Sequence, residues 1–162
     1  MRASAIERFA YGTPLSDVED SQVHTAERSG TLLVGRILLG LIFAFSGFHK
    51  LTALGETAAQ IAAHGIPAAH VMAAVAGCAE LAGGVALILG LLSRVAAIGL
   101  IVFMIPTTLM FHNFWAYSGN DFQVQMVNFM KNLAIIGGLA LMVGSGAGRY
   151  SIDGKLRSPK VA

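Results

Sequence analysis

The stretch "GCAELAGGVALILGLLSRVAA" (residues 77–97) decides the fold. It is an apolar run that carries a single carboxylate, Glu80, and is interrupted only by "LLSR" around Ser93. Such an interruption is too short for anything but a tight helical hairpin. The stretch therefore predicts the end of one membrane-spanning helix and the start of the next.

The composition of the whole chain agrees with a bilayer as its solvent. Apolar residues make up 55% of the sequence and charged residues 12%, with a mean hydropathy of +0.67, which lies outside the balance of a soluble domain. A hydrocarbon core about 30 Å thick needs roughly 20 apolar residues of helix. Four runs satisfy this length: 31–51, 68–92, 94–117 and 124–146. We predict an all-α integral membrane protein, a bundle of four transmembrane helices in contact with lipid.

Charge and cysteine content exclude other classes of protein. A net charge of +2 with scattered basic residues argues against a nucleic-acid partner. The single cysteine, Cys78, excludes an internal disulfide, a CxxC redox pair and a thiolate zinc site.

The polar ends of the chain predict its domains and its orientation. We expect a polar, poorly ordered tail over 1–30, in which "IERFAY" could form a short surface helix, then a transmembrane domain over 31–146 and a second polar tail over 147–162. With four spans, most basic residues fall on one side of the membrane. These are Arg2, Arg8, Arg28, Arg94, Arg149, Lys155, Arg157 and Lys160. The positive-inside rule then places both termini in the cytoplasm.

Helical spacing predicts which residues face the interior of the bundle. One face of the first run carries Arg36, Gly40, Phe43, Gly47 and Lys50, and one face of the second carries Ala73, Gly77, Glu80 and Gly84. The third run places Ile105, Thr108, His112 and Trp115 together, and the fourth has a polar stripe of Gln125, Asn128 and Lys131 or Asn132. The small residues on these faces favour close helix packing.

Ionisable residues inside the spans are functional candidates, because each charge costs about 2.5–3.5 kcal/mol near the bilayer centre. At about 1.5 Å of rise per residue, Glu80 and Arg36 are expected at a similar depth and as partners. They would form the floor of a polar cleft, and the residues of its mouth would be His49, Lys50, His112 and Lys131. We consider Glu80 and His112 candidate catalytic residues, and Arg36, His49, Lys50, Asn128 and Lys131 candidate ligand-binding residues.

Simpler interpretations of the same residues stay open. Glu80 and Arg36 could form a purely structural ion pair, and Lys50 could be an interfacial lysine that extends its ammonium to water. Trp115 and Tyr117 suit the aromatic belt at a membrane surface. The spacing of His49 and His112 does not predict a metal site.

Several motifs in order resemble the DoxX family of small bacterial membrane proteins. They are "GRILLGLIFAFSGFHKL" (35–51), "GIP" (65–67), the stretch quoted first, "HNFW" (112–115) and "GAGRYSID" (146–153). Ala147 departs from the proline that is common in the family's version of the last motif. The resemblance implies four spans, a location in the inner membrane, and a link to thiosulfate:quinone oxidoreduction or to oxidative-stress complexes. It implies no settled set of catalytic residues.

Three functions are compatible with these observations. The first is a redox-system subunit that binds a quinone, whose carbonyls would accept hydrogen bonds from residues of the cleft, with Glu80 relaying protons. The sequence has no haem ligand pair, iron–sulfur cysteines or dinucleotide fingerprint, so a membrane or soluble redox partner would supply electrons. The second is a non-catalytic subunit that anchors such a partner. The third is a small-solute carrier, which four spans would support only as a homo-oligomer.

Overall fold

The computed structural model describes residues 15–157, with side chains for residues 27–156. The elements run in the order α2 (Leu15–Thr52), α3 (Leu54–Ala63), α4 (Ala69–Leu89), α5 (Ser93–Phe111), the 3-10 turn η1 (Phe114–Ala116), α6 (Gly119–Ser145) and α7 (Ile152–Arg157). Four segments are long and apolar enough to cross a bilayer: Glu27–Thr52, Ala69–Leu89, Ser93–Ala116 and Gly119–Ser145. The predicted all-α protein with four spans is confirmed.

The two polar regions contain more helix than the sequence suggested. The first helix begins at Leu15, so residues 15–30 extend α2 and are not a poorly ordered tail. The "IERFAY" segment lies outside the described residues. Two short helices were also missed: α3 follows the first span, and α7 lies in the C-terminal segment.

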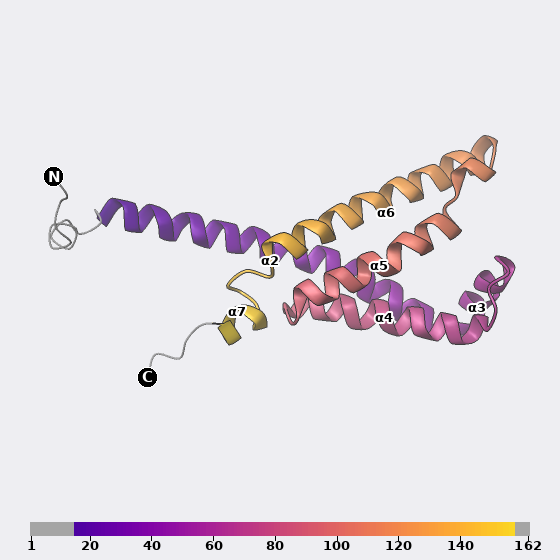
Figure 1. The fold of residues 1–162 in the computed structure, drawn as a ribbon, viewed down its shortest axis with the longest axis horizontal. Helices are drawn as coiled ribbons and strands as arrows, with labels where there is room; N and C mark the ends of the chain where they lie inside the picture. The colour runs from indigo at the N-terminus through magenta and orange to yellow at the C-terminus, as the bar shows by residue number, and fades with distance from the viewer. Residues whose placement is uncertain (1–14, 158–162) are drawn as a thin grey trace, which may run out of the picture.

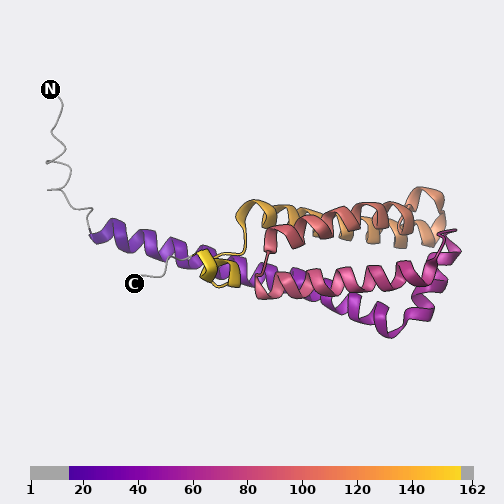
Figure 2. The ribbon, with the colours of Figure 1, turned by 60° about the horizontal axis from the view of Figure 1, so that its bottom comes forward.

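The helices form two layers, each made of two spans (Figure 1). In one layer, α2 and α4 lie side by side, with α3 packed against α4. In the other layer, α5 and α6 form a hairpin, and Figure 2 shows this hairpin above the first pair. The start of α2 and helix α7 lie toward the same end of the molecule, as an even number of spans requires. We call this the terminal end of the bundle, and the other the distal end.

Glycines bring α2 and α4 into backbone contact. A Cβ atom added to Gly84 would lie 2.4 Å from the Ala44 nitrogen, and one added to Gly47 would lie 2.4 Å from the Leu81 nitrogen. Backbone atoms cannot rotate away as a side chain does, so these contacts determine the register of the two helices. The small-residue faces predicted for the first two spans are confirmed.

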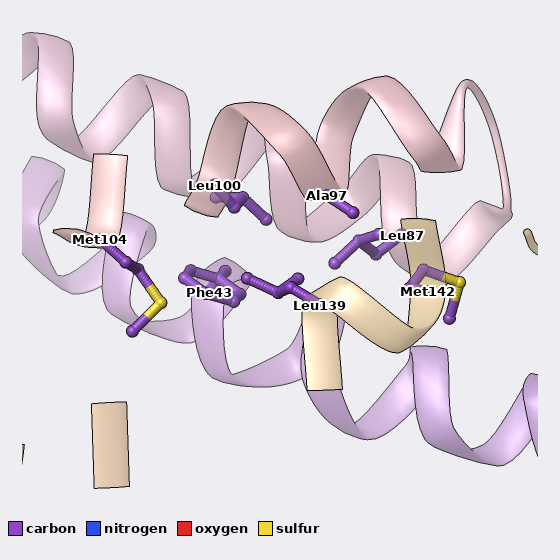
Figure 3. Packing of buried hydrophobic residues seen from close by; sticks show 7 residues of the cluster. All are labelled: Phe43, Leu87, Ala97, Leu100, Met104, Leu139 and Met142. Carbon is purple, nitrogen blue, oxygen red and sulfur yellow. The ribbon is translucent and has the colours of Figure 1, made fainter. Parts of the chain in front are cut away.

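Apolar side chains from all four spans meet between the layers (Figure 3). Phe43, Leu87, Leu100, Met104 and Leu139 belong to this buried cluster, together with Ala97 and Met142. The opposite faces of the helices expose large apolar side chains, such as Phe45 on α2 and Leu141 on α6. Exposure of this kind suits contact with lipid and not with water.

The C-terminal segment closes the turn between α4 and α5. Gly90 ends α4 with φ of 68°, and Leu92 has φ of 47°, a left-handed conformation that is unfavourable for a side chain with a Cβ atom. The Asp153 carboxylate accepts hydrogen bonds from the Leu92 nitrogen (2.8 Å) and the Ser93 nitrogen (2.9 Å). Asp153 therefore caps α5 and holds this strained turn in place.

Substitution of Gly84 by alanine tests the backbone contact between α2 and α4. The added methyl group would collide with the backbone at Gly40 and Ala44, and we expect a loss of about 1–3 kcal/mol or more in unfolding free energy. Gly137→Ala on α6 is the matched control, because a Cβ there meets nothing within 4 Å. Thermal unfolding in detergent measures both, and equal stability of the two variants would contradict the contact.

Candidate functional site

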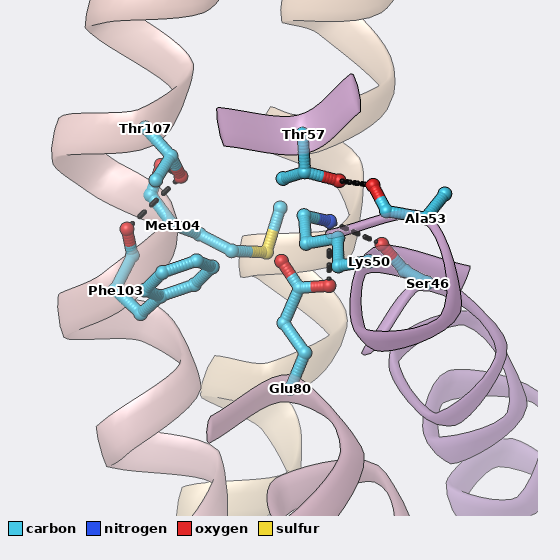
Figure 4. A network of polar contacts seen from close by, with 8 residues as sticks. All are labelled: Ser46, Lys50, Ala53, Thr57, Glu80, Phe103, Met104 and Thr107. Carbon is cyan, nitrogen blue, oxygen red and sulfur yellow. Dashed lines mark hydrogen bonds and ion pairs between the residues drawn. The ribbon is translucent and has the colours of Figure 1, made fainter. Parts of the chain in front are cut away.

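A partly buried ion pair joins the two spans of the first layer (Figure 4). Lys50 Nζ on α2 lies 2.8 Å from Glu80 Oε2 on α4. The Glu80 side chain is 7% exposed and that of Lys50 is 28% exposed. The carboxylate is thus enclosed, while the ammonium is still accessible from one side.

The register of the helices explains why these two charges meet. Gly47 packs on the backbone of Leu81, so the next turn of α2 lies opposite Glu80. Ser46 lies one turn before Lys50 and accepts a hydrogen bond of 2.6 Å from its ammonium. An ammonium has three donors, and the described residues accept from two of them. One donor of Lys50 therefore has no acceptor in the described part of the chain.

Helices from both layers surround the ion pair. Figure 4 places Met104 of α5 beside the Glu80 carboxylate and Thr57 of α3 beside Lys50. The Thr57 hydroxyl donates to the Ala53 carbonyl oxygen at 3.1 Å, and that of Thr107 to the Phe103 carbonyl oxygen at 3.0 Å. Because the Glu80 side chain is enclosed by the protein, the ion pair experiences a lower dielectric constant than water and its attraction is strengthened.

The predicted partnership between Glu80 and Arg36 is wrong. Arg36, which is 2% exposed, lies near the terminal end and donates to the carbonyl oxygens of Leu87 (3.3 Å), Ile88 (3.0 Å) and Tyr150. Arg36 precedes Lys50 by fourteen residues, about 21 Å of helix. The depths of Arg36 and Glu80 were estimated from the ends of the apolar runs. This estimate was wrong because the glycine contacts between α2 and α4 determine which residues face each other.

Polar side chains of the second layer form a separate group. His112 Nδ1 and Gln125 Oε1 are hydrogen-bonded at 2.9 Å, and Asn132 donates to the Thr108 hydroxyl at 3.0 Å. Both bonds join α5, or the residue that ends it, to α6. These residues hold the hairpin together, and Asn128 is half-buried on the same helix.

The other candidate residues point outward. His49 at the end of α2 and Lys131 on α6 are both exposed. Of the seven candidates, the structure brings together only Glu80 and Lys50. Arg36 lies near the terminal end of the bundle. His112 lies with its partner Gln125 in the hairpin of α5 and α6.

Sequence reasoning missed three polar residues that the structure shows to matter. Ser46 lies four residues before Lys50, a spacing that places both on one helical face and could have been noticed. Thr57 lies on the missed helix α3. Asp153 caps a helix that begins sixty residues earlier in the sequence, and no local sequence pattern predicts such a cap.

Comparison with known proteins matches this chain to one family model and to bacterial membrane proteins. The family model described as DoxX matches residues 31–113. The inner membrane protein YphA of Escherichia coli is 31% identical over 128 residues, which cover 79% of this chain and 91% of that protein. The inner membrane protein YqjF of the same organism is 35% identical over 122 residues, covering 75% and 88%. The uncharacterized membrane protein Rv3486 of Mycobacterium tuberculosis is 30% identical over 137 residues, covering 81% and 84%. No solved structure matches the chain.

A double-mutant cycle tests the ion pair. Lys50→Met leaves the buried Glu80 carboxylate without its partner, and we expect a loss of about 3–5 kcal/mol in unfolding free energy. Adding Glu80→Gln removes that charge and should restore part of the loss. Denaturation in detergent, with the exposed Lys131→Met as control, measures the coupling. Additive effects of the two substitutions would show that the residues do not interact.

Proposed function

The chain belongs to the DoxX family of inner-membrane proteins, and from this premise we propose that it binds a quinone beside Lys50 and Glu80 as part of a membrane redox system. The membrane location follows from the four apolar spans. The distribution of basic residues favours a cytoplasmic position for both termini. The distal end, which carries the ion pair, would then face the periplasmic half of the bilayer.

The observation that carries the proposal is the unused donor of Lys50. A quinone is apolar except for two carbonyl oxygens, so its site needs a hydrogen-bond donor in an otherwise apolar wall. The Lys50 ammonium has such a donor, is held in place by Ser46 and Glu80, and is partly accessible. The apolar side chain of Met104 lies beside this pair (Figure 4).

The ion pair also suits the charge changes of quinone chemistry. Reduction to a quinol takes two electrons, which a redox partner protein would supply, and two protons. The Lys50 ammonium would stabilise negative charge as it develops on a carbonyl oxygen. Lys50 would donate one proton to that oxygen and regain a proton from water by way of Glu80, which lies 2.8 Å away, and the second proton of the quinol would follow the same route.

A second candidate function, anchoring of a partner protein without catalysis, is favoured by the exposure of α6. In its most apolar 18-residue segment, only 11% of the residues are buried within the described chain, whereas the corresponding share is 22% to 28% in the other three spans. Such a helix has a large surface available to a membrane partner. In this case the ion pair would serve stability alone.

Quinone binding can be measured with the full-length protein in nanodiscs of neutral lipid. We expect decylubiquinone to bind in isothermal titration, and the Lys50→Met/Glu80→Gln double variant to bind about tenfold more weakly, because it lacks the ammonium donor without retaining a buried charge. Lys131→Met is the matched control and should bind as the unchanged protein does.

Equal affinity in the double variant and the unchanged protein would overturn the quinone site. If, in addition, that variant still co-purified with the same membrane partners, the anchoring function would account for the protein better.

A further inference from the structure

We propose that the terminal end of the bundle holds the phosphate of an anionic phospholipid in a pocket between Arg94 and Arg149. The pocket has a volume of about 220 Å³ and lies where α6 gives way to the C-terminal segment. It is lined by these two arginines and by the backbone of Gly146, Ala147 and Gly148. It is separate from the ion pair of Lys50 and Glu80, and the proposal does not depend on the quinone site.

The two arginines have donors to spare. A guanidinium carries five N–H donors, and within the described residues that of Arg94 makes one hydrogen bond, to the Gly144 carbonyl oxygen at 3.3 Å. The Arg149 guanidinium lies 5.5 Å from the centre of the Tyr150 ring and makes no hydrogen bond within the same residues. Guanidinium groups bind phosphate oxygens in pairs, so both are suited to this ligand.

The backbone of the pocket also presents unpaired donors. The N–H groups of Ala147, Gly148 and Arg149 donate no hydrogen bond within the described residues. Ala147 is nevertheless only 6% exposed, and a buried N–H group usually has a partner. Gly148 has a φ of 75° and turns the chain between these groups, and consecutive N–H groups in a turn can converge on an anion.

The carboxylate in the pocket does not cancel this positive charge. Asp153 already accepts hydrogen bonds from the Leu92 nitrogen and from the nitrogen and hydroxyl of Ser93. It also interacts electrostatically with the buried Arg36. Asp153 is one negative charge against the three positive charges of Arg36, Arg94 and Arg149, so these described residues leave the region of the pocket with a net positive charge.

The position of the pocket favours a lipid over inorganic phosphate. Arg94 is the second residue of its span, and Ser145 is the last residue of the next, so the pocket lies at the level where lipid headgroups meet the apolar core. On the membrane side, Val95 is 65% exposed and Leu141 is 76% exposed. Acyl chains can lie along these side chains while the phosphate occupies the pocket.

Native mass spectrometry of the full-length protein in neutral detergent tests the site, with phosphatidylglycerol and phosphatidylcholine as probes. We expect one phosphatidylglycerol to bind in preference to phosphatidylcholine, and Arg149→Gln to weaken its binding about tenfold. Arg149 is exposed and makes no hydrogen bond within the described chain, so this variant should fold normally. Arg94→Gln should have a similar effect, and the exposed Lys155→Gln, outside the pocket, should have none.

Two results would overturn the proposal. Equal loss of phosphatidylglycerol in Arg149→Gln and Lys155→Gln would indicate general attraction to a basic surface. Displacement of the bound lipid by millimolar inorganic phosphate would assign the pocket to a free anion and not to a headgroup.

Discussion

The close approach of α2 and α4 is the contact on which the other features depend. Gly47 and Gly84 let the two backbones touch, so neither helix can slide along the other without a collision. This register places Lys50 beside Glu80 toward the distal end and Arg36 beside the last turn of α4 toward the terminal end. One set of small residues therefore determines the partners of Lys50, Glu80 and Arg36.

The two ends of the bundle use their buried charges differently. At the terminal end, Arg36 ties α2 to the end of α4 and to Tyr150, and Asp153 caps α5. Arg36 donates three hydrogen bonds to backbone carbonyl oxygens, while its buried Nε has no partner among the described residues. These bonds and the cap by Asp153 stabilise the fold. Toward the distal end, Lys50 keeps a donor without an acceptor in the described chain and stays partly accessible. A bilayer makes an unsatisfied donor costly, and a ligand that accepts a hydrogen bond would remove this cost.

The spans and their interior faces could be predicted from the sequence, because apolar length and helical spacing are local properties. The expected faces of Arg36, Gly40 and Phe43, and of Ala73, Gly77 and Glu80, are buried as predicted. The partners of the charges could not be predicted in the same way. They depend on the register between helices. The ends of the apolar runs are known from the sequence only to within a few residues, which is too imprecise to determine this register. The sequence also did not determine which of two neighbouring residues on α6 faces inward. Helical spacing allowed either Lys131 or Asn132, and in the structure Asn132 is the more buried of the two.

The pairing of Lys50 with Glu80 can be measured directly by solid-state NMR in bilayers. Protein labelled with ¹⁵N at lysine side chains and ¹³C at glutamate carboxyl groups should show a dipolar contact between Nζ and Cδ that disappears in Glu80→Gln. The N–O separation of 2.8 Å predicts a strong coupling. A contact that persists in this variant, or no contact in the unchanged protein, would contradict the register from which the candidate site is built.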